Sequence, residues 1–168
     1  MPDIIFDTNV LSNFSLADRF DLLKLLYNDS ACCAGAVATE IQRGIQCGHV
    51  GLSAVSTSLA HGWPRIEDPA STTEHHLFAA LSISLGAGES ACIVLAAQRG
   101  YVFACDDRLA RNEAARLGVK LTGTVGILIK AVMVEAIDLK EANTVLRRMV
   151  KAGFYAPVKS ITTTRVCG

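Results

Sequence analysis

Short apolar runs alternate with amphipathic segments along the chain, and this alternation predicts an α/β fold. The apolar runs predict strands at residues 3–6, 31–34, 101–105 and 119–121, with a brief extended segment at 63–67. The amphipathic segments predict helices near residues 16–26, 37–47, 51–62, 71–85, 89–99, 108–117 and 138–150. Strands that alternate with helices favour a mainly parallel central sheet covered on both faces, which is a three-layer α/β/α sandwich.

One apolar segment, residues 125–137, bears on whether the chain could cross a membrane. Lys130 and Glu135 interrupt it, and it is shorter than the roughly 20 residues that a membrane-spanning helix needs. We therefore expect a buried helix and no membrane partner. No linker or repeat divides the chain, so residues 1–168 are expected to form one domain, with a core at about 3–135 and a C-terminal helix and tail at 138–168.

The composition indicates a compact globule in a reducing compartment. Hydrophobic residues make up 51% of the chain and charged residues 19%, which excludes a disordered chain. The six cysteines form no C-x-x-C pair and several lie in apolar runs, so buried reduced thiols are expected rather than disulfides or zinc ligands. The N-terminus carries acids and no basic leader, which favours a cytoplasmic location.

The net charge is zero, but the charges are unevenly distributed. Residues 1–107 contain 5 Lys and Arg against 12 Asp and Glu, whereas residues 108–168 contain 11 against 4. This asymmetry suits an acidic site beside a basic surface that contacts phosphate groups. Unrelated solvated helix faces would produce the same distribution, so both interpretations stay open.

Acidic residues stand at the ends of predicted strands and near the starts of predicted helices. Asp7 follows the first strand, Asp106 and Asp107 follow the strand at 101–105, and Glu40 and Glu89 are expected in the first turns of helices. In a parallel sheet these places share one edge, so the acids are expected to meet in one cleft. Gathered carboxylates repel one another unless a cation such as Mg²⁺ or Mn²⁺ neutralises them. Taken singly, each acid could be a turn former or a helix cap.

Five stretches together resemble the PIN-domain family. They are residues 4–9 (IIFDTN), 37–41 (VATEI), 86–91 (GAGESA), 105–111 (CDDRLAR) and 123–128 (GTVGIL). The resemblance is closest to a VapC-like branch that carries a G-x-G-E-S helix and a D-[DE]-x-x-A-R stretch, and it covers residues 3 to about 135. It implies a PIN-like sandwich and a metal-dependent ribonuclease that acts on single-stranded RNA.

The resemblance also implies a set of catalytic and metal-binding acids. Asp7, Glu40, Glu89 and Asp106 are the expected catalytic residues, and Asp7, Glu89 and either Asp106 or Asp107 are expected to bind Mg²⁺ or Mn²⁺. Asp106 is preferred over Asp107 because it stands where this branch has its regular aspartate. Many family members have aspartate in place of Glu89, which is one methylene longer.

Polar and basic neighbours of these acids are candidates for supporting roles. Hydrogen bonds to the ligands or to phosphate are expected from Thr8, Asn9, Ser90 and Thr124. Capping and turn roles fit each of these four equally well. Arg108 and Arg111 are candidates for phosphate contacts, with a solvated helix face as the alternative.

Three functional hypotheses remain at the level of sequence. The leading one is an endoribonuclease such as the toxin of a toxin–antitoxin pair, for which the resemblance implies a homodimer and a small antitoxin protein that blocks the cleft. The second is a PIN-fold nucleic-acid-binding or regulatory module with little or no activity, although all four acidic positions are occupied. The third, a phosphatase with Asp7 as nucleophile, ranks low because Asn9 stands where that chemistry usually has a second acid.

Overall fold

The computed structural model describes residues 3–167, and within them five parallel strands form one sheet. The strands are β1 (Ile4–Phe6), β2 (Ala31–Ala34), β3 (Arg65–Glu67), β4 (Val102–Ala104) and β5 (Lys120–Thr122). Their order in the sheet is β3-β2-β1-β4-β5. The chain first builds away from β1 on one side and then returns to its other side with β4. The strand order therefore switches between β1 and β4, where open α/β sheets form their ligand crevice.

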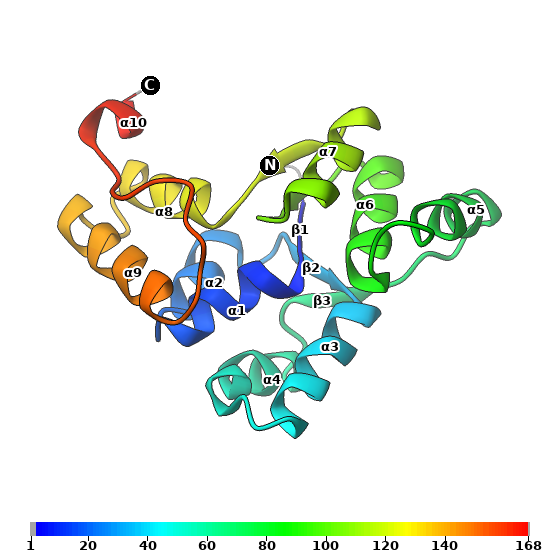
Figure 1. Ribbon diagram of the computed structural model, residues 1–168, viewed down its shortest axis with the longest axis horizontal. Helices are drawn as coiled ribbons and strands as arrows, with labels where there is room; N and C mark the ends of the chain where they lie inside the picture. The colour runs from blue at the N-terminus through cyan, green and yellow to red at the C-terminus, as the bar shows by residue number, and fades with distance from the viewer. Residues whose placement is uncertain (1–2, 168) are drawn as a thin grey trace.

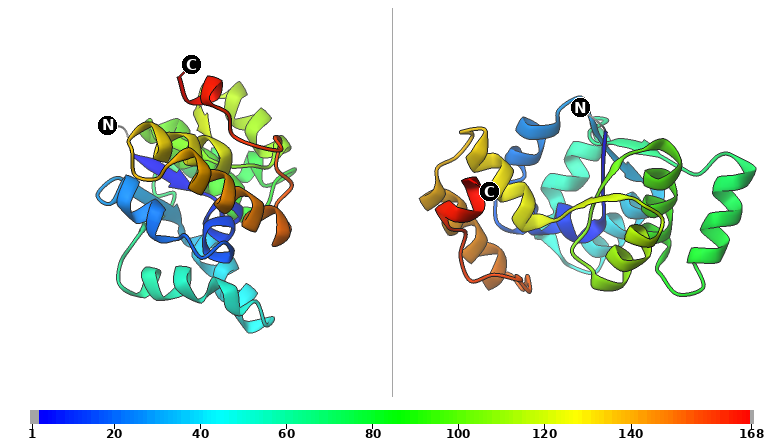
Figure 2. Two further views of the ribbon diagram at one scale, coloured as in Figure 1. Left: turned by 90° about the vertical axis from the view of Figure 1, so that its left-hand side faces the viewer. Right: turned by 90° about the horizontal axis from the view of Figure 1, so that it is seen from above.

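Helices cover both faces of this sheet, as the predicted three-layer sandwich requires. They are α1 (Thr8–Leu16), α2 (Asp21–Tyr27), α3 (Gly35–Gln46), α4 (Ser53–Ala60), α5 (Thr72–Leu81), α6 (Ala87–Arg99), α7 (Arg108–Arg116), α8 (Thr124–Met133), α9 (Leu139–Lys151) and α10 (Thr163–Cys167), with a 3-10 turn η1 (Val50–Leu52) before α4. In Figure 1, α5 and α6 lie on one side of the sheet and α1, α2, α8 and α9 lie on the other. The view from above in Figure 2 shows the same separation. The predicted α/β class and parallel sheet are confirmed.

The core is continuous across the sheet because apolar side chains point from both of its faces. All three residues of β1 are buried, and so are Phe103 and Ala104 of β4. Helix α6 packs against β1, β2 and β4 with a nearly unbroken run of buried residues from Ser90 to Ala96. Burial on both faces explains why these strands are continuous apolar runs in the sequence.

The path between β1 and β2 differs from the sequence-based expectation. One amphipathic helix was predicted at residues 16–26, but the chain forms α1 and α2, and Asp18 between them has a left-handed backbone with φ 57°. Helix α1 begins directly after β1 because Asp7 caps it, with Oδ1 accepting a hydrogen bond from the Val10 N–H at 2.8 Å.

Smaller corrections concern boundaries. Helix α3 begins at Gly35, so Glu40 lies in its second turn and not in the first turn as expected. The helices expected at residues 51–62, 71–85 and 125–137 are shorter than predicted, and the tail, expected to be irregular, contains α10. No helix in residues 3–167 is long and apolar enough to cross a bilayer.

The cysteines follow the expected pattern with one exception. Cys32, Cys33, Cys92 and Cys105 are free and buried, whereas Cys47 is free but exposed. The side chain of Cys167 lies outside the described residues.

Candidate functional site

The two central strands bring the first pair of acids together. Asp7 follows β1 directly, and Asp106 lies two residues beyond the end of β4. The Asp7 N–H donates a hydrogen bond to the Ala104 carbonyl at 3.1 Å, which ties the ends of the two strands to each other. The acids therefore lie on either side of the point where the strand order switches, as the sequence predicts from their positions after strands.

Asp7 is the most deeply buried of the acids, with 2% of its surface exposed. Its Oδ1 caps α1, but its Oδ2 is buried with no hydrogen-bond partner among the described residues. Burial raises the pKa of Asp7 to about 7. The Val10 hydrogen bond opposes this pKa rise, and so does the nearby Cys105 thiol, although this thiol makes no hydrogen bond of normal geometry to Oδ2. The negative charges of Asp106 and Glu89 add to the rise. Asp7 thus carries a carboxylate oxygen that the protein itself leaves unsatisfied.

Glu40 and Glu89 line a cavity of about 250 Å³ next to Asp7. The Thr8 hydroxyl donates a hydrogen bond to Glu40 Oε2, which fixes the position of this carboxylate. Burial raises the pKa of Glu89, and the charges of Asp107 and Glu40 raise it further. Glu89 also accepts the Gly86 N–H at 3.3 Å, so this carboxylate helps to cap α6.

Gly88 makes room for Glu40 in this cavity. A Cβ atom at position 88 would lie 2.7 Å from Glu40 Oε1. The glycine of the G-x-G-E-S stretch therefore has a packing reason: it lets the start of α6 approach a carboxylate on α3.

Asp106 is held by neutral donors from two helices. Its Oδ1 accepts the Thr124 N–H at 2.9 Å, and its Oδ2 accepts the Thr124 hydroxyl at 2.5 Å and the Asn13 amide at 3.2 Å. The Asn13 amide also donates to Thr124 Oγ1 at 3.0 Å. Asn13 was missed by the sequence analysis because α1 was missed; the Asp7 cap followed by apolar Val10, Leu11 and Phe14 was the available signal.

Asp107 has a different contact from its neighbour. Its Oδ1 accepts the Ala110 N–H at 2.9 Å and so caps α7. Its charge still reaches the cleft, because it raises the pKa of Glu89. The capping role is the simple explanation that the sequence left open for each acid, and the structure shows it for Asp7, Asp107 and Glu89.

The remaining candidate residues lie around these acids and differ in their exposure and in their hydrogen bonds. Arg111 Nη1 donates to the carbonyl oxygens of Cys105 and Thr122, both at 2.7 Å, so this arginine joins the ends of β4 and β5. Arg108 is exposed at the start of α7, and Asn9 is exposed and lines the cavity beside Asp7. The Ser90 hydroxyl is fully buried and has no hydrogen-bond partner among the described residues.

The acids of the cleft fit the ligand requirements of a hard divalent ion only in part. Within residues 3–167, no group of three or more His, Cys, Asp or Glu side chains is close enough to form a ready ligand cluster. The buried, unpartnered Asp7 Oδ2 is nevertheless an oxygen that a cation would satisfy, and all the neighbouring acids are oxygen donors. This chemistry suits Mg²⁺ or Mn²⁺, which bind few carboxylates and retain several waters.

Comparison with known proteins supports the family inferred from the motifs. A family model described as a PIN domain matches residues 3–165, which is nearly the whole chain. Searches of curated proteins and of solved structures found no match. The chain therefore belongs to the PIN-domain family, whose members are generally nucleases that use divalent metal ions.

Proposed function

We propose that this protein is a metal-dependent endoribonuclease that cleaves phosphodiester bonds in single-stranded RNA. The observation that carries the proposal is the buried Asp7 carboxylate, whose Oδ2 has no partner among the described residues and whose pKa is raised to about 7. Such a group costs folding free energy unless a ligand compensates it, so its place in a cleft indicates function.

The proposed ligands are Asp7, Glu89 and Asp106, whose carboxylates would have to move closer together to bind one ion. A divalent ion bound there would lower the pKa of a water molecule and offset the charge of the phosphate. Thr124 and Asn13 hold the Asp106 carboxylate in one orientation, because they donate to both of its oxygens. Thr8 holds Glu40 at the other side of the cavity, where Glu40 could accept a proton from the attacking water.

Asp106 is preferred to Asp107 as the ligand on geometric grounds. Asp106 is placed by hydrogen bonds from the start of α8 and from α1, beside the strand that ends at Asp7. Asp107 instead satisfies the N-terminus of α7, which by itself accounts for an aspartate at this position.

Cleavage of labelled RNA tests the proposal directly. A mixed set of single-stranded oligomers is incubated with Mg²⁺, Mn²⁺ or EDTA and with the wild type or Asp7→Asn. We expect cleavage that needs the ion and falls by more than about 100-fold in Asp7→Asn, because even residues that only support a metal ligand contribute about 10- to 100-fold. Asp29→Asn, a change at an exposed acid outside the cleft, is the matched control and should cleave like the wild type.

The outcomes separate the alternatives. Equal cleavage by wild type and Asp7→Asn would place the activity elsewhere and contradict the proposed site. Binding of RNA by both proteins with no cleavage under any ion would favour the second hypothesis, a nucleic-acid-binding module without activity.

The biological role is a further part of the proposal. The resemblance to the VapC-like branch supports a cytoplasmic toxin that acts as a homodimer and is blocked by a small antitoxin protein. Induced expression of the wild type should then arrest growth, whereas Asp7→Asn should not. Growth at the same rate with both proteins would contradict the toxin role, whereas the proposed cleavage activity is tested separately.

A further inference from the structure

A second cavity adjoins Asp106, and the acidic cleft does not account for it. It measures about 650 Å³ and lies between the start of α7, the turn from β5 to α8 and the loop at residues 154–157. Asp106 forms part of its lining, so the cavity opens next to the proposed cleavage site. This volume is within the range of pockets that hold small organic ligands, roughly 300–1,000 Å³.

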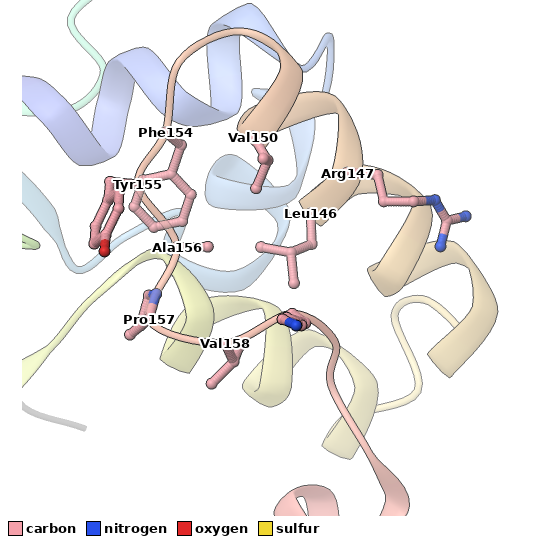
Figure 3. Close-up of a pocket in the computed structure, with 9 residues that line it drawn as sticks. Leu146, Arg147, Val150, Phe154, Tyr155, Ala156, Pro157 and Val158 are labelled. Carbon is pink, nitrogen blue, oxygen red and sulfur yellow. The ribbon is translucent and has the colours of Figure 1, made fainter.

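Tyr155 lines this cavity and is unusually exposed. Its side chain is 95% exposed, although a tyrosine ring normally buries much of its surface. Figure 3, a close-up of the neighbouring pocket between α9 and this loop, shows Tyr155 on the side of the loop away from Arg147. At this exposure the ring is accessible to a planar ligand.

The loop that carries Tyr155 is fixed at both ends. The Phe154 N–H donates to the Met149 carbonyl at 2.9 Å at the end of α9. Further along, the Asn143 side chain pairs with the backbone of Ile161, with distances of 2.8 and 2.9 Å. The aromatic ring is thus carried by a backbone segment that is anchored on both sides, which lowers the entropy cost of ordering this segment when a ligand binds.

The part of the lining on α7 offers groups that recognise a nucleotide. Arg108 and Asn112 lie one turn apart on α7, so they face the same way, and both are exposed and line the cavity. Among the described residues, the Arg108 side chain has no hydrogen bond or ion pair. In contrast, Arg111 is already occupied by two backbone carbonyls. Arg108 is therefore the guanidinium available for a phosphate, and the Asn112 amide can donate to and accept from a base edge.

We infer that this cavity holds the nucleotide adjacent to the cleaved phosphate, with its base stacked on Tyr155 and its phosphate bound by Arg108. The inference rests on the proposed function and adds a subsite to it. A base can stack on a protein ring only when it has left a duplex, so this subsite favours single-stranded RNA. It also assigns a binding role to the tail beyond residue 153.

Binding measured in EDTA tests the subsite separately from cleavage. The probe is a fluorescein-labelled single-stranded RNA oligomer, titrated with wild type, Tyr155→Ala, Tyr155→Phe or Ile83→Ala at one salt concentration. We expect Tyr155→Ala to weaken the Kd by about 5- to 150-fold, which corresponds to the loss of one stacked base. Tyr155→Phe keeps the ring and should bind within about 2-fold of the wild type. Ile83→Ala, at a residue 87% exposed that does not line this cavity, is the control for removing an exposed apolar side chain.

Oligomers that lack one base at a time locate the stacked nucleotide. In the wild type, one abasic position should weaken binding, and in Tyr155→Ala the same position should no longer matter. Equal affinity of Tyr155→Ala and wild type would overturn the inference, and so would a loss that is the same for every abasic oligomer. An effect of Tyr155 without any cleavage would refute the nuclease and keep the subsite; cleavage without an effect of Tyr155 would refute the subsite alone.

Discussion

Two groups of acids in this protein are partly withdrawn from water, and they differ in whether a cation compensates their charge. In one, Arg99 bridges Glu67 and Glu74, with Nη1 2.6 Å from Glu67 Oε2 and Nε 3.0 Å from Glu74 Oε1. The hydrogen bonds from Arg99 and from the Ser71 and Ala70 N–H groups lower the pKa of Glu74 to about 2. In the cleft, burial and neighbouring acids raise the pKa of Asp7 to about 7.

The difference shows what distinguishes a structural acid from a functional one in this fold. Arg99 fastens α6 to β3 and α5, and every carboxylate that it touches gains a cation. Around Asp7, Glu40, Glu89 and Asp106, the hydrogen bonds come from hydroxyls, an amide and backbone N–H groups. The chain therefore supplies orientation in the cleft but leaves the negative charge for a ligand to neutralise.

Removing the cation from the first group should have the largest effect on stability. Arg99→Met leaves Glu74 without a cation among the described residues, whereas Glu67 keeps the partly exposed Arg65 at 3.2 Å. We therefore expect a loss of about 2–4 kcal/mol in the free energy of unfolding. The loss stays below that of a fully buried pair because the Arg99 side chain is 28% exposed. Chemical denaturation measures it.

Arg116→Met is the matched control for this change. Arg116 pairs with Glu113 at 3.2 Å, but its side chain is 76% exposed, so the variant should stay within about 0.5 kcal/mol of the wild type. Similar losses in both variants would mean that the compensated group contributes no more than an ordinary surface pair.

Asp7→Asn should change the free energy of unfolding in the opposite direction, with a gain of intermediate size. The folded protein holds the Asp7 proton up to pH about 7, whereas the unfolded chain releases it near its ordinary pKa of 3.8. The folded state therefore binds more protons between these values, and the stability of the metal-free wild type should fall as pH rises from about 4 to about 7. Asp7→Asn removes this slope and should be about 1–3 kcal/mol more stable than the wild type at pH 8.

Thermal melts in EDTA and in Mg²⁺ measure both parts of this prediction. Added Mg²⁺ should raise the Tm of the wild type at pH 8 and leave that of Asp7→Asn nearly unchanged, because the ion stabilises only a state that binds it. Glu74 provides the internal reference: its contribution is present above pH about 4.5 and is lost as pH falls towards 2. A wild type whose stability rises steadily from pH 4 to 8 would contradict the description of Asp7.

The sheet and most of the acids could be located from the sequence for a physical reason. Strands buried on both faces must be continuous apolar runs, and these runs stand out against polar segments. Once β1 and β4 are recognised, the direction of a parallel sheet places Asp7 and Asp106 at the same edge. The G-x-G-E-S and D-[DE]-x-x-A-R stretches then indicated the family.

Helix α1, and with it Asn13, was not predicted from the sequence because this helix depends more on its surroundings than on its own apolar pattern. Polar Ser12, Asn13 and Ser15 interrupt its apolar positions, while the leucines of α2 show a stronger helical spacing. The helix forms because Asp7 caps it and because Leu11 and Phe14 are buried in the core. Which carboxylate receives an arginine and which receives only neutral donors depends on contacts between distant segments, and local spacing does not encode them.

Asn13→Ala probes the neutral donors and should have a smaller effect on stability than the two changes above. It removes one donor to Asp106 and one to Thr124, so we expect a loss of about 0.5–1.5 kcal/mol. Cleavage should fall by about 10- to 100-fold, as for other residues that orient a metal ligand.

Thr144→Ala removes the hydroxyl of a half-buried threonine on α9, outside the acidic cleft, and is the control for Asn13→Ala. This hydroxyl donates an exposed hydrogen bond to the Lys140 carbonyl. Its activity should match that of the wild type. If Asn13→Ala cleaves at the same rate as Thr144→Ala, then Asp106 does not depend on this hydrogen bond for its position.

The smallest effect is expected for Asp107→Asn, and it separates the two adjacent aspartates. Asparagine caps helices about as well as aspartate, so α7 should keep its start and the stability should change by less than about 0.5 kcal/mol. Removing the Asp107 charge should slightly lower the pKa of Glu89, because this charge raises it in the wild type. The acidic limb of the pH–rate profile should therefore move to slightly lower pH, with the maximal rate retained.

Asp106→Asn is the matched change one residue earlier, and it should abolish cleavage while leaving the α7 cap intact. Both variants remove one carboxylate charge from the same turn, so a purely electrostatic effect on the cleft would be similar in the two. A large loss of cleavage in Asp106→Asn alone would mean that the location of the carboxylate matters and not only its charge. The carboxylate that Thr124 and Asn13 hold by hydrogen bonds would then be the one needed for cleavage. A large loss in Asp107→Asn alone would reverse the assignment, because a cap that asparagine replaces cannot explain lost activity.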